Sequence, residues 1–492
     1  MNLADDLRAG ANGHPETPAI IFGDRSFSYS HLDKQVDSFA AGLYRLGVRA
    51  GDRVAFAVGN RPEFIVIHFG ILRAGAVSVP LNPSFKTAEL RPYLSSVTPR
   101  VIIADDSVVN EVMSAGPHTA PVFVIGEHLT ARPFDQIFED AAAPEVEIEP
   151  ESLAVLAYTS GTGGAPKAAM LTHGNLAANV EQMLNIKGAR TEPGDIVLGV
   201  LPMFHIYALN VVLGLTFRQG ATVLLVERFD ATETMQAVLR HRVTILIGAP
   251  PMFISWLTAP GLEASDLAHV RFAVSGASAL SPEVISAFRD RFGVEIWEGY
   301  GLTETSPTLT TTRMTQQRQG SIGKTLEGIE LRLVNETGED ASPGDPGEIW
   351  VRGANVFQGY WDQPEVTAEA FSDGWFRTGD VAYRDEDGYL WLVDRMKELI
   401  IVSGFNVYPK EVEDVIRMHP AVADVAVVGV PHPLQGESVK AYVVARPGES
   451  VGEAEMTVHC TRSLARFKVP TEIEFVLDLP RLASGKVLKR LL

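Results

Sequence analysis

The sequence predicts an α/β protein: a large N-terminal domain of layered α/β subdomains, a small β-barrel-like section, and a small α+β C-terminal domain. Apolar strand-like runs alternate with helical patterns through the first half, which is typical of layered, largely parallel sheets. After about residue 320, short alternating strands separated by glycine-rich turns take over. A charged break at 394–398 (Asp-Arg-Met-Lys-Glu) then precedes a compact unit. We therefore predict domains at 1–394 and 395–492.

Composition limits the classes of protein that this chain can represent. Its 492 residues are 46% hydrophobic and 21% charged, as in soluble globular proteins. A net charge of −19 argues against a nucleic-acid partner, because phosphate contacts need a basic surface. The single cysteine, Cys460, excludes an intrachain disulfide and a multi-cysteine zinc site. The first residues lack the apolar core of a signal peptide, so we expect a cytoplasmic protein, and the sequence does not indicate its oligomeric state.

The first elements are expected in a strand–helix order. Short strands are predicted at 18–22 and 26–29, followed by a helix over 31–46. The apolar residues Leu32, Val36, Phe39, Ala40 and Leu43 would share one face of that helix. A strand at 54–58, a helix at 62–73 and a strand at 76–79 follow.

The same alternation continues through the middle of the chain. It recurs at 223–226, 235–241, 245–247 and 272–275. Ser281 and Pro282 predict the start of another helix, with serine as the N-cap and proline at the first helical position.

The segment 196–217 contains no charged residue and is long enough to cross a bilayer. Pro202, His205 and Asn210 interrupt it. We therefore expect a buried strand, a turn and a core helix, and no transmembrane segment.

Short strands are then predicted at 329–334, 348–352 and 389–393. In the C-terminal unit, Pro409 should open a helix, and strands should follow at 425–430, 439–445 and 473–476. Cys460 falls in a helical pattern over 455–464, where it is expected to be a buried apolar residue rather than a nucleophile.

The segment 158–167 (Tyr-Thr-Ser-Gly-Thr-Gly-Gly-Ala-Pro-Lys) follows an apolar strand expected at 153–157. Its glycines let the backbone bend so that several N–H groups can point at one anion, and Lys167 adds positive charge. In physical terms this is a phosphate-binding loop, with a flexible surface loop as the alternative. Pro166 stands where a Walker A loop has its second glycine, so neither that loop nor a dinucleotide fingerprint is expected.

This loop resembles the signature of the adenylate-forming superfamily, Thr-Ser-Gly-Thr-Thr-Gly-x-Pro-Lys-Gly. The superfamily includes acyl-CoA synthetases, coumarate-CoA ligases, luciferases and peptide-synthetase adenylation domains. Gly163 replaces the second threonine and Ala168 replaces the last glycine, so one hydroxyl of the phosphate grip is missing. Other motifs similar to those of the superfamily follow in order over nearly the whole chain, at 201–205, 275–280, 298–304, 374–380, 394–397, 403–409 and 480–486.

The resemblance implies an ATP site and a catalytic centre. Tyr300 would stack on adenine, Asp380 would hold the ribose hydroxyls, and Thr159 and Glu304 would bind Mg²⁺. The implied catalytic residues are Lys486, Glu304, Thr303 and His205. The implied ATP-binding residues are Thr159, Ser160, Gly161, Thr162, Gly163, Lys167, Gly276, Ala277, Ser278, Glu298, Gly299, Tyr300, Gly301, Thr303, Asp380, Arg395 and Lys486.

The resemblance also implies an acyl pocket and a mobile C-terminal domain. The pocket would contain His205, Tyr207, Asn210, Gly299 and Pro307. Lys397 would lie at the hinge, and rotation of the C-terminal domain would bring either Lys486 or the Gly404–Phe405 loop to the site. The coenzyme A (CoA) and hinge residues are thus Lys397, Gly404 and Phe405.

The predicted function is ATP-dependent acyl-CoA synthesis with ATP, Mg²⁺ and CoA. The apolar segment around Tyr207 favours a medium- or long-chain fatty acid as substrate, with an aryl or phenylpropanoid acid as the alternative. An acyl-AMP ligase that loads a carrier protein and a non-catalytic adenylate binder remain open. A peptide-synthetase module is not expected, because no carrier domain follows Leu492.

Ordinary structural roles also remain open for the same residues. Glu304 could be a surface acid, Lys486 a solvated lysine, Asp380 a turn residue and His205 a core histidine. A serine hydrolase is not expected, because the chain has no Gly-x-Ser-x-Gly elbow.

Overall fold

The computed structural model describes most of the chain. It leaves out residues 117–118, 161–165, 189, 260–261, 278–279, 314–315, 319, 336, 396–399, 408, 450, 481–488 and 490–491. At 160, 393–395, 406 and 410 it describes the backbone alone.

Two large sheets form the N-terminal part, and most of their strands are parallel, as the alternating pattern predicts. In spatial order, the strands of the nine-stranded sheet are β16 (Lys324–Thr325), β15 (Thr308–Thr311), β14 (Ile296–Gly301), β13 (Phe272–Ser275), β12 (Ile245–Gly248), β10 (Ile196–Gly199), β11 (Thr222–Leu225), β1 (Pro18–Phe22) and β2 (Arg25–Ser28). Those of the seven-stranded sheet are β7 (Arg132–Pro133), β6 (Val122–Ile125), β5 (Val101–Asp105), β3 (Arg53–Ala57), β4 (Val77–Leu81), β8 (Leu153–Ser160) and β9 (Pro166–Thr172).

Strand β3 shows why both faces of the seven-stranded sheet are covered. Val54 and Phe56 join the core shared with the nine-stranded sheet, whereas Ala55 and Ala57 join a separate core on the opposite face. Helices α2 (Tyr29–Arg45) and α3 (Pro62–Arg73) contribute to the first core, and α4 (Thr87–Val97) and α5 (Val109–Ser114) to the second. The predicted face of α2 is fully buried, which confirms the periodicity.

Further helices cover the nine-stranded sheet and connect the parts. Ser281 caps α10 (Pro282–Phe292) by accepting a hydrogen bond from the Val284 N–H, as the sequence predicts. The other N-terminal helices and helical turns are α1 (Asp5–Gly13), η1 (Phe134–Ile137), α6 (His173–Leu184), α8 (Ala231–His241), α9 (Pro250–Thr258), η3 (Ala264–Leu267), η4 (Thr303–Thr305) and α11 (Pro364–Ala370).

The uncharged segment 196–217 folds as strand β10, a turn and a buried helical run. The run is a π-helix, η2 (Tyr207–Gly214), continued by α7 (Leu215–Arg218). The expected core helix is therefore present, although its first half has the wider π geometry that occurs most often at functional sites. Within the residues that the structure describes, no helix is long and apolar enough to cross a membrane.

Two smaller sheets follow, and they are mainly antiparallel. The short strands and glycine-rich turns after about residue 320 predict such an arrangement. One contains β17 (Ile329–Val334), β18 (Gly347–Gly353), β20 (Trp375–Arg384), β19 (Phe371–Ser372) and β21 (Leu390–Arg395). The other contains β23 (Phe405–Val407), β22 (Ile400–Val402), β25 (Gly436–Ala445), β24 (Val422–His432) and β26 (Glu472–Val476).

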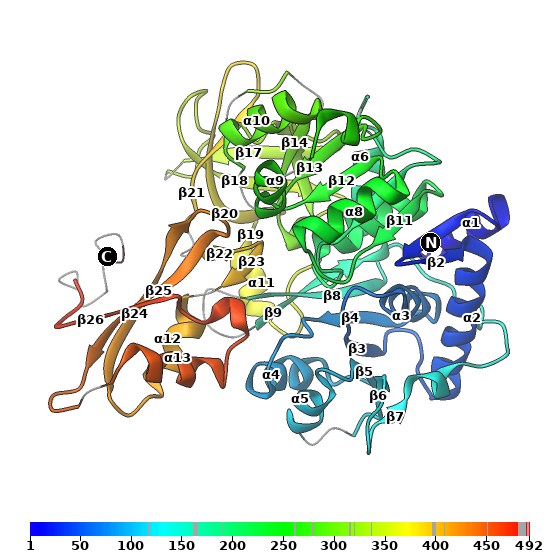
Figure 1. Cartoon of the computed structure of the whole chain (residues 1–492), viewed down its shortest axis with the longest axis horizontal. Helices are drawn as coiled ribbons and strands as arrows, with labels where there is room; N and C mark the ends of the chain where they lie inside the picture. Colours follow the sequence, from blue (N-terminus) through cyan, green and yellow to red (C-terminus); the bar gives the residue numbers. More distant parts are fainter. Residues whose placement is uncertain are drawn as a thin grey trace.

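The last of these sheets has its own hydrophobic core with α12 (Pro409–Arg417) and α13 (Glu453–Thr461). It lies on the side of the molecule opposite α1 and α2 (Figure 1). Cys460 is fully buried in this core, and burial raises the pKa of its thiol to about 11, in agreement with the predicted apolar role. A short turn, η5 (Arg466–Lys468), follows α13.

Candidate active site

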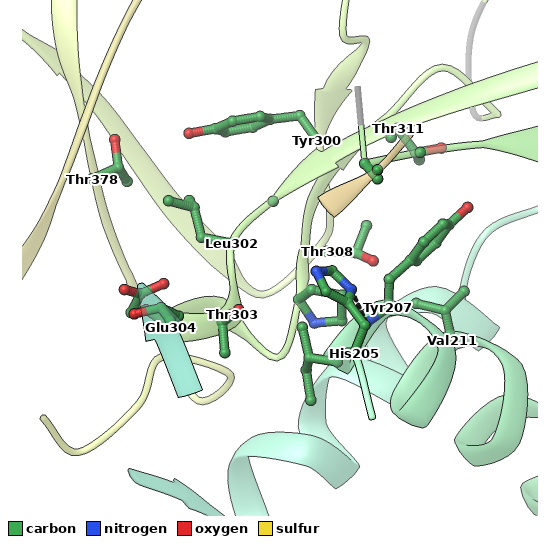
Figure 2. Close-up of a pocket in the computed structure, with 18 of the residues that line it drawn as sticks. His205, Tyr207, Val211, Tyr300, Leu302, Thr303, Glu304, Thr308, Thr311 and Thr378 are labelled. Atoms are coloured by element: carbon green, nitrogen blue, oxygen red, sulfur yellow. Dashed lines mark hydrogen bonds between the residues drawn. The ribbon is translucent and has the colours of Figure 1, made fainter. Parts of the chain in front are cut away.

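A cavity lies where the large sheets, the third sheet and the C-terminal part meet. The predicted motifs converge on it from β8, β9, η2, the turn after β13, the β14–η4 segment and β20. In Figure 2, Glu304 and Thr378 lie toward one end of the cavity, and Tyr207 and Val211 lie toward the other. His205 and Thr308 lie between these two ends.

Glu304 and Lys167 occupy the first end. Glu304 is 7% exposed, and its Oε1 accepts a hydrogen bond of 2.8 Å from the Tyr360 hydroxyl. The Lys167 ammonium lies 5.2 Å from the centre of the same Tyr360 ring. Thr159, which is paired with Lys167 across β8 and β9, also lines the cavity. A carboxylate, a hydroxyl and a lysine thus face one space, as binding of a metal-bound polyphosphate requires.

A second polar pair lies on β14 and β20. The Tyr300 hydroxyl donates to Asp380 Oδ2 at 2.7 Å, and both residues are buried. Within β20, the Asp380 N–H donates to the Thr378 hydroxyl at 3.1 Å. Tyr300 and Asp380 therefore form one hydrogen-bonded pair that lines the cavity with an aromatic ring and a carboxylate. The backbone of Arg395 pairs with that of Asp380 between β21 and β20.

The opposite end is built by the π-helix and the turn after β13. A Cβ atom on Gly276 would lie only 2.7 Å from the Tyr207 ring, so glycine allows the turn to pack directly on that ring. His205 is desolvated, which lowers its pKa to about 4, so its imidazole is neutral at pH 7. Its Nδ1 accepts the Tyr207 N–H at 3.3 Å, and His205 can offer the acid a hydrogen bond but no charge.

Two residues predicted for the acyl pocket and the ATP site do not line this cavity. The Asn210 amide donates to the backbone oxygens of Leu176 and Ser306 at 3.1 and 2.6 Å, so it ties α6 to the segment after η4. The Glu298 carboxylate accepts the Leu280 N–H at 3.0 Å and faces a neighbouring surface cavity. Burial raises the pKa of Glu298 to about 7.

Apart from Phe405, which lines a side cavity described below, the remaining predicted residues fall into two groups. Those that line the main cavity are Gly276, Ala277, Gly299, Gly301, Thr303, Pro307 and Gly404. Those that lie outside the described residues are Gly161, Thr162, Gly163, Ser278, Lys397 and Lys486, and Ser160 and Arg395 are described by their backbone only.

Sequence reasoning missed several residues of the cavity, above all Arg313. Its guanidinium is buried and lines the cavity, and burial lowers its pKa to about 10, so it stays positively charged at pH 7. The Tyr207 and Ser275 hydroxyls line the same cavity and have no hydrogen-bond partner among the described residues. No local pattern marks Arg313, because only the packing of β13, β15 and η2 brings it to the end of the cavity that Tyr207 and Val211 line. This end is called the acyl end below.

A side cavity opens beside His205 and Thr159. Phe85, Tyr93 and Phe204 line it from the N-terminal part, and Phe405 and Phe467 line it from the C-terminal part. Phe405 stacks on Phe467 with a 4.5 Å centroid separation and on Phe204 with 6.4 Å. The predicted Gly404–Phe405 loop therefore lies where the two cavities meet.

The oxygen donors at the first end fit Mg²⁺. Glu304 and Thr159 offer the carboxylate and hydroxyl oxygens that this ion prefers. No group of three or more His, Cys, Asp or Glu side chains with metal-ligand geometry occurs among the described residues. Mg²⁺ bound with a nucleotide usually takes its remaining ligands from phosphates and water.

Comparisons with known proteins agree with this geometry. Residues 7–361 match the model of the AMP-binding enzyme family, and residues 411–486 match that of the AMP-binding enzyme C-terminal domain. A long-chain-fatty-acid–CoA ligase of Bacillus subtilis is 35% identical over 99% of this chain and 93% of its own length. A feruloyl-CoA synthase of Amycolatopsis is 36% identical over 96% of this chain and 95% of its own length.

A solved structure extends the agreement to the fold. The o-succinylbenzoate CoA synthetase of Bacillus subtilis, bound to a product analogue, superposes with a TM-score of 0.87 at 29% identity. The match covers 99% of this chain and 97% of that chain. The chain therefore belongs to the AMP-binding enzyme family and is an acid–thiol ligase.

Proposed function

We propose that this chain converts a carboxylic acid with an apolar body into its CoA thioester in two steps. It is an adenylate-forming acyl-CoA ligase that uses ATP, Mg²⁺ and CoA. In the first step, a carboxylate oxygen attacks the α-phosphorus of ATP and pyrophosphate leaves. In the second, the thiol sulfur attacks the acyl carbon, its proton is lost and AMP leaves. The observation that carries the proposal is the convergence of Glu304, Lys167 and Asp380 on one cavity that continues to His205 and Tyr207.

The protein residues have separate tasks in this scheme. Lys167 and the loop 161–165 would bind phosphates of ATP, and Tyr300 and Asp380 would hold the nucleoside. Thr159 and Glu304 would hold Mg²⁺, which offsets the charge that develops between two anions. Thr303 would hold the α-phosphate. Lys486 would reach the attacking oxygen, and Arg395 would reach the ribose.

The neutral imidazole of His205 lines both cavities. We therefore propose that it borders the passage through which the thiol of CoA reaches the activated acid. The side cavity would admit the pantetheine arm, with Phe405 and Gly404 as one wall. We retain the domain division at 394 and 395, with Lys397 as the hinge. In this arrangement the C-terminal domain takes the orientation for the thiol step.

A medium- or long-chain fatty acid is the first candidate substrate. Met183, Ile206 and Val211 give the acyl end an apolar lining, and a relative of this chain is a long-chain-fatty-acid–CoA ligase. Gly299 and Pro307 complete this end of the cavity.

A specific observation favours a second candidate, an aryl acid with a polar substituent. The charged guanidinium of Arg313 and the Tyr207 and Ser275 hydroxyls line the cavity together. A purely alkyl chain would leave the Tyr207 and Ser275 hydroxyls unsatisfied, which costs about 1–3 kcal/mol for each group. A hydroxyl or carboxylate on an aromatic ring would instead bind to them, and a feruloyl-CoA synthase is also a relative.

Pyrophosphate release with ATP and Mg²⁺ over a panel of fatty, cinnamic and benzoic acids tests the proposal. Sustained release that needs CoA and peaks at one class of acid would support it and identify the substrate. A stoichiometric burst that CoA does not relieve would instead indicate transfer to a carrier protein. ATP binding without release for any acid would indicate a non-catalytic adenylate binder.

A further inference from the structure

Lys468 is a buried lysine that the reaction scheme above does not use. It ends the turn η5 in the C-terminal part, and it is only 2% exposed. Its ammonium donates to Glu411 Oε1 at 2.7 Å and to Glu89 Oε1 at 3.1 Å. Lysine is almost never fully buried unless it is paired, so this arrangement depends on both carboxylates.

The two carboxylates belong to different parts of the chain. Glu411 lies on α12, in the same unit as Lys468. Glu89 lies in the first turn of α4, which packs on the outer face of the seven-stranded sheet. Figure 1 shows α4 beside the red C-terminal segment. Rotation of the C-terminal part would carry the Lys468–Glu411 pair away together and leave Glu89 behind.

A second hydrogen bond holds the Glu89 carboxylate in position for this contact. Its second oxygen accepts the Lys86 N–H at 2.9 Å, which fixes the carboxylate at the start of α4. Its side chain is 4% exposed in this arrangement. Burial raises the pKa of Glu89, whereas the nearby Lys468 charge lowers it. Removing the lysine would therefore leave an uncompensated acid in a buried site.

The same contact borders the side cavity. The Lys468 ammonium lies 4.6 Å from the centre of the Phe85 ring, and the neighbouring Phe467 stacks on Phe405. Phe85 comes from the N-terminal part, and Phe405 and Phe467 come from the C-terminal part. The ion pair thus lies at the seam where both parts together enclose the proposed route of the thiol.

We propose that Lys468 and Glu89 form a buried latch that holds the C-terminal part in the orientation that encloses the side cavity. Lys468 is then a positioning residue for the thiol step, and it has no part in adenylation. This inference rests on the proposed function, because it requires the side cavity to admit the thiol of CoA.

The test measures the two half-reactions separately in the full-length enzyme. Adenylation is followed as acid-dependent ATP–pyrophosphate exchange without CoA, and the thiol step as AMP release from supplied acyl-AMP and CoA. Lys468→Met and Glu89→Gln should each slow the thiol step by about tenfold or more while exchange stays within about twofold of wild type. The exchange reaction also reports that each variant is folded.

A double variant separates a latch from two independent contacts. If the residues act as a pair, Lys468→Met/Glu89→Gln should be no slower in the thiol step than the worse single variant. Lys440→Met provides the matched control, because Lys440 pairs with Glu474 inside the C-terminal sheet at 2.8 Å. It should leave both half-reactions unchanged.

Three outcomes would overturn the latch: equal loss of both half-reactions, an unchanged thiol step, or effects that simply multiply in the double variant. Failure of the proposed function would look different. In that case the wild-type enzyme itself would show no acid-dependent exchange, or no AMP release with CoA.

Discussion

At the scale of single residues, we expect Arg313 to have the largest effect on substrate choice. It places a full positive charge at the end of a cavity whose other walls include Val211 and Met183. Arg313→Leu should lower kcat/KM for aryl acids with a hydroxyl or carboxylate substituent by about 10- to 100-fold, because those groups lose a charged donor. Unsubstituted fatty acids should be used as well as before, or better.

The measurement is pyrophosphate release across a matched series of acids with and without the polar substituent. Arg240→Leu, an exposed arginine on α8, is the control for the loss of one charge. If Arg313→Leu lowered kcat/KM equally for every acid in the series, Arg313 would be a structural residue with no role in selecting the substrate.

Glu298 links the site to the pH dependence of stability. Burial raises its pKa from 4.5 to about 7, so the folded protein binds this proton more tightly than the unfolded chain does. Stability contributed by the neutral form is present below pH 4.5 and is lost as the pH rises to about 7. Glu298→Gln keeps an acceptor for the Leu280 N–H and has no charge to bury.

We therefore expect Glu298→Gln to stabilise the protein by about 1–3 kcal/mol at pH 8 and by almost nothing at pH 4.5. Thermal denaturation at both pH values measures this as a rise in Tm that is present only at the higher pH. The exposed Glu386→Gln is the control. An equal rise in Tm at both pH values would mean that burial does not raise the pKa of Glu298.

At the scale of elements, the acyl end depends on contact between a turn and a π-helix. Gly276→Ala would place a methyl group 2.7 Å from the Tyr207 ring, so either the turn or η2 must shift. We expect kcat/KM for the acid to fall by about tenfold or more with little change in Tm, because the shift is local.

Gly13→Ala is the matched control for Gly276→Ala, since a Cβ atom there meets no other atom within 4 Å. Steady-state kinetics and thermal denaturation of both variants decide the matter. Unaltered kinetics in Gly276→Ala would show that the turn can move without disturbing the pocket.

The elements also show what the sequence could predict. The buried face of α2 followed from periodicity, because one face of this helix meets a core. The bounds of α3 also match the prediction, although nearly all of that helix is buried. The π geometry of η2 did not, because it depends on packing against α6 and the turn after β13. Motif residues such as Glu304 and Asp380 were found by resemblance, whereas Arg313 and Lys468 act through contacts between distant segments that no local pattern records.

At the scale of the whole molecule, one site must serve two reactions that need different surroundings. In the described arrangement Gly404 approaches Ala277 and Ala249, and a Cβ atom on Gly404 would lie 3.6 and 3.8 Å from their Cβ atoms. Gly404 also has a φ of +84°, a conformation that glycine adopts without strain. The backbone of the C-terminal part therefore lines the cavity at this point, which is the arrangement that we propose for the thiol step.

Lys486, the lysine predicted to act in adenylation, comes later in the sequence than Gly404. Lys486→Ala should lower ATP–pyrophosphate exchange by about 100-fold or more, because a positive charge at the attacking oxygen stabilises the transition state of adenylation. The same variant should release AMP from supplied acyl-AMP and CoA at close to the wild-type rate. This is the reverse of the pattern expected for Lys468→Met.

The two variants assayed together test whether the molecule divides its work between two orientations. Lys489→Ala is the control for a lysine near the C-terminus, since Lys489 pairs with Glu413 at 2.7 Å inside the C-terminal part. Opposite losses in Lys486→Ala and Lys468→Met would mean that one domain presents two faces to one site. Parallel losses would mean that both lysines act in a single arrangement, and the rotation would then be unnecessary.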